Sequence, residues 1–160
     1  MAGLASAQGM TGLEFMQAMV DGRLPSPPIT ETMGFQGGGT AEKGKVTFVG
    51  EPGEHLYNPI GSVHGGFAMT ILDSAMGCAV HTTLAAGELY TTLEVKVNFV
   101  RPITLNTGPV RCEGIVVHRG GKIVTAEGRL IAERSGKLLA HGTTTCLVVK
   151  TPGRSIPTPP

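Results

Sequence analysis

Hydrophobic residues cover nearly every side of a helical projection between residues 64 and 85. A helix that is hydrophobic all round is typical of a buried position, so we predict a long helix here that the rest of the fold encloses. Asp73 is the only Asp, Glu, Lys, Arg or His from Gly65 to Val80. This carboxylate is therefore expected to lie among hydrophobic neighbours.

The remaining patterns indicate β-strands and one shorter helix. Thr11 and Glu14 have the spacing of a capping box, which predicts a short N-terminal helix. Six strands are predicted, at residues 32–36, 45–49, 89–100, 109–118, 122–133 and 138–149, with Gly37–Gly39 as the turn between the first two. Consecutive strands pair most simply as an antiparallel meander, and a single helix is buried only if the sheet curves around it. We therefore predict an α+β fold in which a curved antiparallel sheet wraps a long central helix.

The length of 160 residues gives room for one domain. We predict an N-terminal helix and linker at 1–27, the sheet-and-helix domain at 28–150, and a disordered, proline-rich tail at 151–160. Only 16% of the residues are charged, against about 25% in typical soluble domains. Because an open sheet edge also invites pairing with a second copy, we expect a homo-oligomer.

Composition excludes several classes of function. The net charge is +1 without a basic run, which argues against a nucleic-acid partner. No hydrophobic stretch approaches the roughly 20 residues of a membrane helix, and the N-terminus does not resemble a signal peptide, so we expect a soluble, cytoplasmic protein. The widely spaced Cys78, Cys112 and Cys146 are expected to be reduced, buried thiols. No His pair has helical ligand spacing, so neither a metal nor another cofactor is predicted.

Two adjacent glycines, Gly65 and Gly66, stand at the start of the predicted central helix. The first N–H groups of a helix have no internal partner and favour negative charge, which suits a carbonyl oxygen as it becomes an oxyanion. The alternative is that the glycines only allow close packing. Asp73 favours the catalytic interpretation because an unpaired buried carboxylate is costly, although a structural Asp bonded to a loop remains the alternative.

Gly65 and Asp73 are eight residues apart, or about 12 Å along one helix. Groups that act on one carbonyl carbon must each lie about 3 Å from it. One copy of the helix cannot meet this requirement, whereas two antiparallel copies can. The sequence therefore predicts an active site at a subunit interface, with two sites in each dimer.

The run from Asn58 through His64-Gly65-Gly66 to Asp73 resembles the hot-dog fold acyl-CoA thioesterases of the phenylacetate-pathway (PaaI-like) type, close to one clade of 4-hydroxybenzoyl-CoA thioesterases. The resemblance covers about residues 28 to 149. It implies hydrolysis of an acyl-CoA to free acid and CoA, and assembly as a dimer or as a homotetramer built from two dimers.

The resemblance also implies roles for single residues. Asp73 is the expected nucleophile or general base, and Gly65 supplies the oxyanion N–H. His64 orients the loop or the thioester, and Asn58 positions the water or the acyl group. Some relatives carry Ser or Thr one turn after the acid, where this chain has Gly77, so the substitute for that hydroxyl is an open question.

For substrate and CoA binding, the candidates are Gly66, Arg101, Arg119, Gly120 and Lys122, with the cations contacting phosphates. Ordinary solvated charge is the alternative for each cation. The acyl group is expected to be aryl, arylacetyl or medium-chain. Two other functions are considered, an enoyl-CoA hydratase and a non-catalytic acyl-CoA-binding or regulatory module. The chain lacks the short acid–His motif that a hydratase usually has. A non-catalytic binding module would have no need of Asp73.

Overall fold

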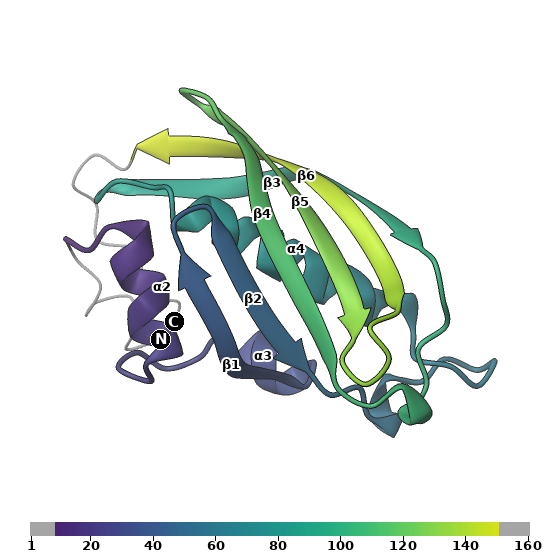
Figure 1. Ribbon diagram of the computed structural model, residues 1–160. Coiled ribbons are helices and arrows are strands. Elements are labelled where there is room, and N and C mark those ends of the chain that lie inside the picture. Colours follow the sequence, from purple (N-terminus) through teal and green to yellow (C-terminus); the bar gives the residue numbers. More distant parts are fainter. Residues whose placement is uncertain (1–8, 151–160) are drawn as a thin grey trace, which may run out of the picture.

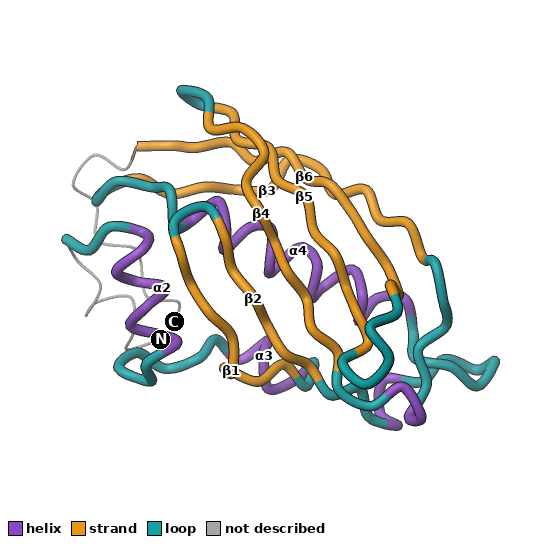
Figure 2. The backbone as a smooth tube through the Cα atoms, viewed as in Figure 1, coloured by secondary structure: helices purple, strands orange, loops and turns teal. Residues whose placement is uncertain are grey.

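A long helix, α4 (Gly65–His81), lies against the concave face of a six-stranded antiparallel sheet in the computed structural model, which describes residues 9–150 (Figure 1). The strands are β1 (Phe35–Glu42), β2 (Lys45–Gly50), β3 (Glu88–Phe99), β4 (Val110–Arg119), β5 (Ile123–Ala132) and β6 (Leu138–Lys150). The other helical segments within residues 9–150 are α2 (Gly12–Val20), α3 (Pro28–Thr32) and two short 3-10 turns, η1 (Glu54–Leu56) and η2 (Leu105–Thr107). Figure 2 shows the sheet curving around α4.

Hydrophobic burial places α4. Its side chains Ile71, Leu72 and Met76 are fully buried against the sheet. Two strand glycines allow the helix to come close, since a Cβ at Gly114 would lie 2.3 Å from the backbone of Ala75. A Cβ at Gly128 would likewise lie 2.9 Å from the Met76 side chain. The predicted central helix is thereby confirmed.

The N-terminal helix α2 has the predicted capping box, in which Thr11 and Glu14 satisfy each other's backbone N–H groups. Met16 on its inner face is buried with Val46 of β2 and Ala79 of α4. The helix therefore contributes to the packing of the sheet. The domain boundaries at residues 27 and 150 stay a prediction, and the tail at 151–160 lies outside the described residues.

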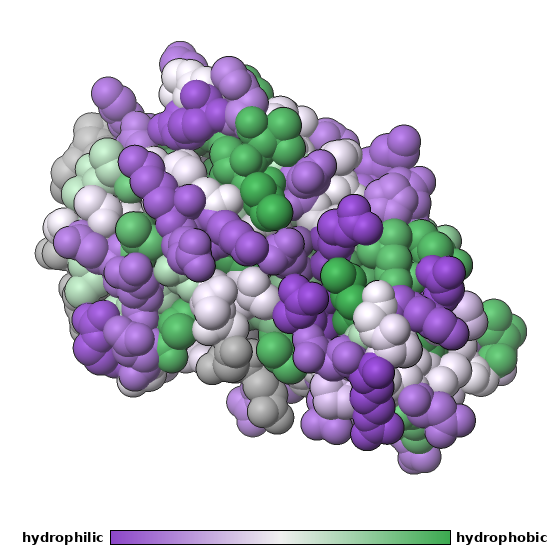
Figure 3. Space-filling model, viewed as in Figure 1, coloured by the Kyte–Doolittle hydropathy of each residue, from purple (hydrophilic) through white to green (hydrophobic). Residues whose placement is uncertain are grey.

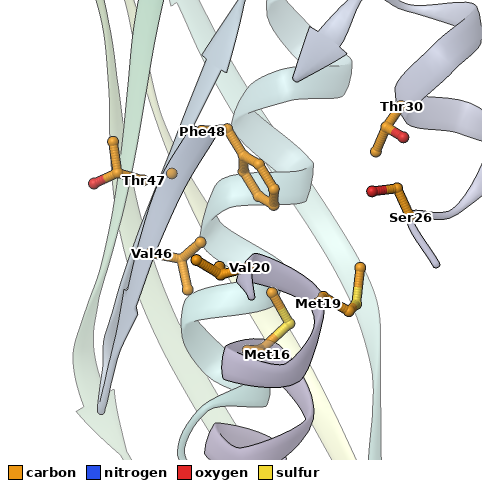
Figure 4. Close-up of a pocket in the computed structure, with 9 residues that line it drawn as sticks. Met16, Met19, Val20, Ser26, Thr30, Val46, Thr47 and Phe48 are labelled. Carbon is orange, nitrogen blue, oxygen red and sulfur yellow. The ribbon is translucent and has the colours of Figure 1, made fainter. Parts of the chain in front are cut away.

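A small hydrophobic crevice of about 30 Å³ separates α2 from the first two strands (Figure 4). It is lined by Met16, Met19, Val20, Ser26, Thr30, Gly39, Val46, Thr47 and Phe48. Such a volume holds about one or two water molecules. The crevice is therefore too small to receive an acyl group.

The prediction for the first strand was wrong in its position. Residues 28–32 form the short helix α3 because Pro28 stands at the first helical position, where its fixed φ favours a helix. The run Gly37–Gly39 lies inside β1, and the turn to β2 comes later, at Gly44 with a φ of +80°. Close backbone contact explains the glycine in the strand, since a Cβ at Gly39 would collide with the carbonyl oxygen of Thr47.

The strand order is β1-β2-β4-β5-β6-β3. Strands β4, β5 and β6 form the predicted meander, whereas β3 pairs with β6 and not with β4. The helix α4 crosses the sheet between β2 and β3, which carries the chain to the far edge. The two edges of the sheet are therefore β1 and β3.

The outer face of the sheet is mainly polar, with separated hydrophobic patches (Figure 3). Ion pairs cross its strands, including Lys45–Glu113 at 2.8 Å and Arg111–Glu133 at 3.0 Å. Across residues 9–150, no helix combines the length and hydrophobicity needed to cross a membrane.

Candidate active site

The N-terminus of α4 offers a free backbone donor. His64 caps the helix, and its Nδ1 accepts a hydrogen bond of 2.9 Å from the N–H of Gly66. The N–H of Gly65 has no hydrogen-bond partner within residues 9–150. The helix dipole favours an anion at this position. Gly65 therefore keeps an available N–H, whereas the N–H of Gly66 is engaged by His64.

A pocket of about 380 Å³ opens beside this donor. It brings together four residues that the sequence singled out, Asn58, His64, Gly65 and Arg101. Its other lining residues are Ser62, Val63, Ala68, Phe99, Val100, Pro102, Ile103, Leu139 and Ala140. A Cβ at residue 65 would lie 3.0 Å from the Phe99 ring, so the glycine allows close packing as well as exposing its N–H.

Asn58 shapes the loop that precedes the helix. Its Oδ1 accepts hydrogen bonds from the N–H groups of Ile60 at 3.1 Å and Ser62 at 3.2 Å. Its Nδ2 donates to the Ser62 hydroxyl at 3.1 Å. These contacts make Asn58 a scaffold for the pocket wall. Its role in positioning water or an acyl group stays a prediction.

Asp73 is half-buried, and its Oδ1 accepts a hydrogen bond of 3.1 Å from the hydroxyl of Thr92 on β3. It lies on the less buried side of α4, one turn beyond Met69, whose side chain is 44% exposed. The carboxylate is therefore neither sealed inside the protomer nor bonded to a loop backbone. Thr92 is a partner of the candidate residue Asp73 that the sequence analysis missed.

Asp73 does not line the pocket that contains Gly65. Within one protomer the two are two helical turns apart on α4, as their spacing predicted. One copy of the chain thus separates the two candidate groups, with the Gly65 N–H beside the pocket and the Asp73 carboxylate next to the edge strand β3.

Comparison with known proteins identifies the family. The sequence profile of the thioesterase superfamily matches residues 60–139, half of the chain. The chain belongs to the thioesterase superfamily. Comparison with curated protein sequences gives no match.

Solved structures similar to this thioesterase carry related names. A phenylacetic acid degradation-related protein from Ralstonia eutropha JMP134 is 28% identical, with a TM-score of 0.73 over 82% of this chain and 98% of that one. A thioesterase family protein from Silicibacter pomeroyi is 25% identical, with a TM-score of 0.74 over 85% and 99%. The phenylacetic acid degradation protein PaaI from Thermus thermophilus is 25% identical, with a TM-score of 0.67 over 76% and 98%. These findings confirm the predicted hot-dog fold, the PaaI-like type and the prediction of an acyl-CoA thioesterase.

The cysteines of the thioesterase do not provide a nucleophile. Burial, with a smaller contribution from the charge of Asp73, raises the pKa of the Cys78 thiol to about 12. Burial also raises the pKa of Cys112 and of Cys146. Because the thiolate is the reactive form, none of the three is activated near neutral pH. Within residues 9–150 no cluster of His, Cys, Asp and Glu could hold a metal ion.

The predicted CoA-binding cations of the thioesterase lie at two ends of the sheet. Arg101 is exposed at the pocket, where its Nη1 donates to the carbonyl of Leu138 at 2.7 Å. Arg119, Gly120 and Lys122 lie at the β4–β5 hairpin at the opposite end (Figure 1). Arg119 forms an ion pair of 3.2 Å with Glu88 and donates to the Gly120 carbonyl. Of the three predicted cations, only Arg101 therefore lines the pocket of its own protomer.

Proposed function

We propose that the protein hydrolyses an acyl-CoA thioester to the free acid and CoA, with Asp73 of one copy and the Gly65 N–H of a second copy acting on the same carbonyl. The observation that carries the proposal is the half-buried Asp73 carboxylate, which is held by Thr92 on an otherwise hydrophobic helix. Burial of a carboxylate lowers the stability of the fold, so stability alone does not explain its presence there. Its position beside an unpaired sheet edge fits a shared site.

The edge strand β3 supports the pairing of two copies. On this strand, Leu93 is 55% exposed and Phe99 is 57% exposed. Met69 of α4, midway between Gly65 and Asp73 in the helix, is 44% exposed. A long hydrophobic edge with unpaired N–H and C=O groups is a template for another strand. A two-fold axis near Met69 would set the two α4 helices antiparallel. Gly65 of each copy would then face Asp73 of the other.

In the proposed reaction, Asp73 takes a proton from a water molecule as that water attacks the thioester carbon. The carbonyl oxygen becomes an anion and is stabilised by the Gly65 N–H and the helix dipole. Collapse of the tetrahedral intermediate breaks the C–S bond and releases the CoA thiolate. The thiolate then takes up the proton that Asp73 accepted from the water. The products are the carboxylic acid and CoA.

A general base fits the contacts of Asp73 better than a nucleophile does. The hydroxyl of Thr92 holds Oδ1, which opposes movement of the carboxylate to bonding distance from a carbon. Oδ2 is left for a water molecule, because a carboxylate accepts hydrogen bonds at both oxygens. We therefore assign Asp73 as the base.

The pocket beside Gly65 is the proposed entrance for CoA, where Arg101 offers a positive charge to its phosphates. Arg119 and Lys122 remain proposed phosphate contacts for CoA in the pocket of a second copy, because an antiparallel pair brings opposite ends of two protomers together. The proposed acyl group is aryl, arylacetyl or medium-chain. We further propose a cytoplasmic dimer, or a tetramer of two such dimers.

The proposal is tested by incubating the protein with aryl-, arylacetyl- and medium-chain acyl-CoA esters and detecting the released thiol. We expect turnover with at least one of the three classes. The matched control is the N-acetylcysteamine thioester of the best acyl group, which has the same reacting bond without the nucleotide. It is expected to show a raised KM because the phosphate contacts are lost. Absence of thiol release from every ester by folded protein would contradict the proposal.

A further inference from the structure

Gly77 lies on α4 one turn after Asp73, and its missing side chain leaves room for Tyr90 of β3. A Cβ built at residue 77 would lie 2.5 Å from the Tyr90 hydroxyl oxygen and 3.1 Å from its ring. Real Cβ atoms do not approach other atoms so closely. The tyrosine hydroxyl therefore occupies the space that a side chain at residue 77 would take.

That space is close to the catalytic carboxylate. Residues four apart on a helix have Cβ atoms about 6 Å apart, so the Cβ position of residue 77 lies next to Asp73. Tyr90 and Thr92 are two residues apart on β3 and point to the same side of the strand. Thr92 already donates to Asp73 Oδ1, so β3 supplies two hydroxyls to this side of α4.

The Tyr90 hydroxyl is available to a ligand. It forms no hydrogen bond with another group among residues 9–150. Within the same residues, every fully buried side-chain nitrogen or oxygen has a partner, so this hydroxyl retains some access to the outside. Because Tyr90 and Asp73 form no hydrogen bond with each other, a water molecule fits the role of a bridge between them.

We propose that the Tyr90 hydroxyl, which lies over Gly77, holds the attacking water for Asp73 from the side of β3. This inference rests on the proposed function of Asp73. Tyr90 is a positioning residue, since it orients the water and takes no proton from it.

The surroundings hold the phenol in place and in its neutral form. The Tyr90 ring lies 5.8 Å from the ring of His81, which in turn lies 5.2 Å from Phe15 of α2. Burial raises the pKa of Tyr90 well above its ordinary value, and the nearby Cys78, Cys146 and Asp73 act in the same direction. At neutral pH the group is therefore a hydrogen-bond donor on a fixed ring.

The first test is Tyr90→Phe, which removes only the hydroxyl. We expect kcat for the best acyl-CoA ester to fall about tenfold, the effect of losing one hydrogen bond to the reacting water. KM is expected to change by less than about twofold, since the hydroxyl does not contact the acyl-CoA. Far-UV circular dichroism and Tm report whether the variant keeps its fold. An unchanged kcat would overturn the proposal.

Moving the hydroxyl separates a chemical role from a packing role. Tyr90→Phe/Gly77→Ser moves the hydroxyl from β3 to the helix, and Tyr90→Phe/Gly77→Ala is its control. Both double variants place a Cβ about 3 Å from the ring, so they share the same crowding. We expect kcat to recover in the Ser variant and to stay low in the Ala variant. Equal rates in the two would contradict the proposal.

Asp73→Asn distinguishes failure of this inference from failure of the proposed function. If Asp73→Asn abolishes hydrolysis while Tyr90→Phe keeps full kcat, only the assignment of Tyr90 is wrong. If Asp73→Asn itself hydrolyses the ester at the normal rate, the proposed role of Asp73 is wrong, and the assignment of Tyr90 fails with it.

Discussion

Replacement of Asp73 by Asn is expected to lower kcat for acyl-CoA hydrolysis by about 100-fold or more, the usual effect of removing a general base. Asn has nearly the same shape, and its amide oxygen can still accept the hydrogen bond that Thr92 donates to Oδ1. The change therefore removes the proton acceptor and leaves the packing of α4 intact. Thiol release measures kcat, and calorimetry on the variant measures binding of the unhydrolysed ester, which is expected to persist.

Glu127→Gln is the matched control for this variant. It also removes one carboxylate, but Glu127 is exposed on β5, between the buried residues Ala126 and Gly128 that face the helix. Its kcat is expected to equal that of the unmodified protein. Normal turnover by Asp73→Asn would exclude this carboxylate from the mechanism.

Gly65→Pro is expected to lower kcat by about 10²–10³-fold, the range for losing one oxyanion donor. Proline has no N–H, and at the first position of a helix its fixed φ is tolerated. The preceding residue must be extended, and His64 already has φ −60° and ψ 138°. The substitution therefore removes the donor in a backbone that accepts proline.

Gly65→Ala is the control that distinguishes loss of the N–H donor from crowding by an added side chain. Alanine keeps the N–H and adds the same Cβ, which would lie 3.0 Å from the Phe99 ring. We expect Gly65→Ala to keep most of its kcat while Gly65→Pro loses it, with similar Tm values for the two. If both lose activity to the same extent, close packing against Phe99 explains the glycine and the N–H is not the donor.

The central helix and the last four strands could be predicted from the sequence because each has a hydrophobic pattern of its own. The first strand was misplaced because a run of three glycines is typical of a turn. A glycine is needed at residue 39 because the backbone there lies close to the carbonyl of Thr47, and this contact cannot be predicted from the sequence. The same holds for Gly114, which admits α4 to the sheet. Contacts between distant segments therefore set the limit of the prediction.

The candidate site residues differ in how far the sequence reveals them. Asp73 and Gly65 could be singled out as candidates because their residue types conflict with a purely structural helix. Thr92 and Tyr90 could not, because a β-bulge between Thr92 and Glu94 shifts the alternation of β3 and leaves Leu93 exposed. If Leu93 faced α4 and side chains alternated strictly along the strand, the hydroxyls of Tyr90 and Thr92 would both point away from α4.

The most direct test of a site shared between two copies is to mix two inactive chains. Asp73→Asn and Gly65→Pro are co-expressed with different tags, and mixed oligomers are purified through both tags. In a mixed pair, one site combines the intact Asp73 of one chain with the intact Gly65 of the other. We predict that the mixed dimer recovers about half of the activity of the unmodified dimer, since one of its two symmetric sites is complete. Mixed oligomers that are as inactive as each parent would show that the two residues do not meet across an interface.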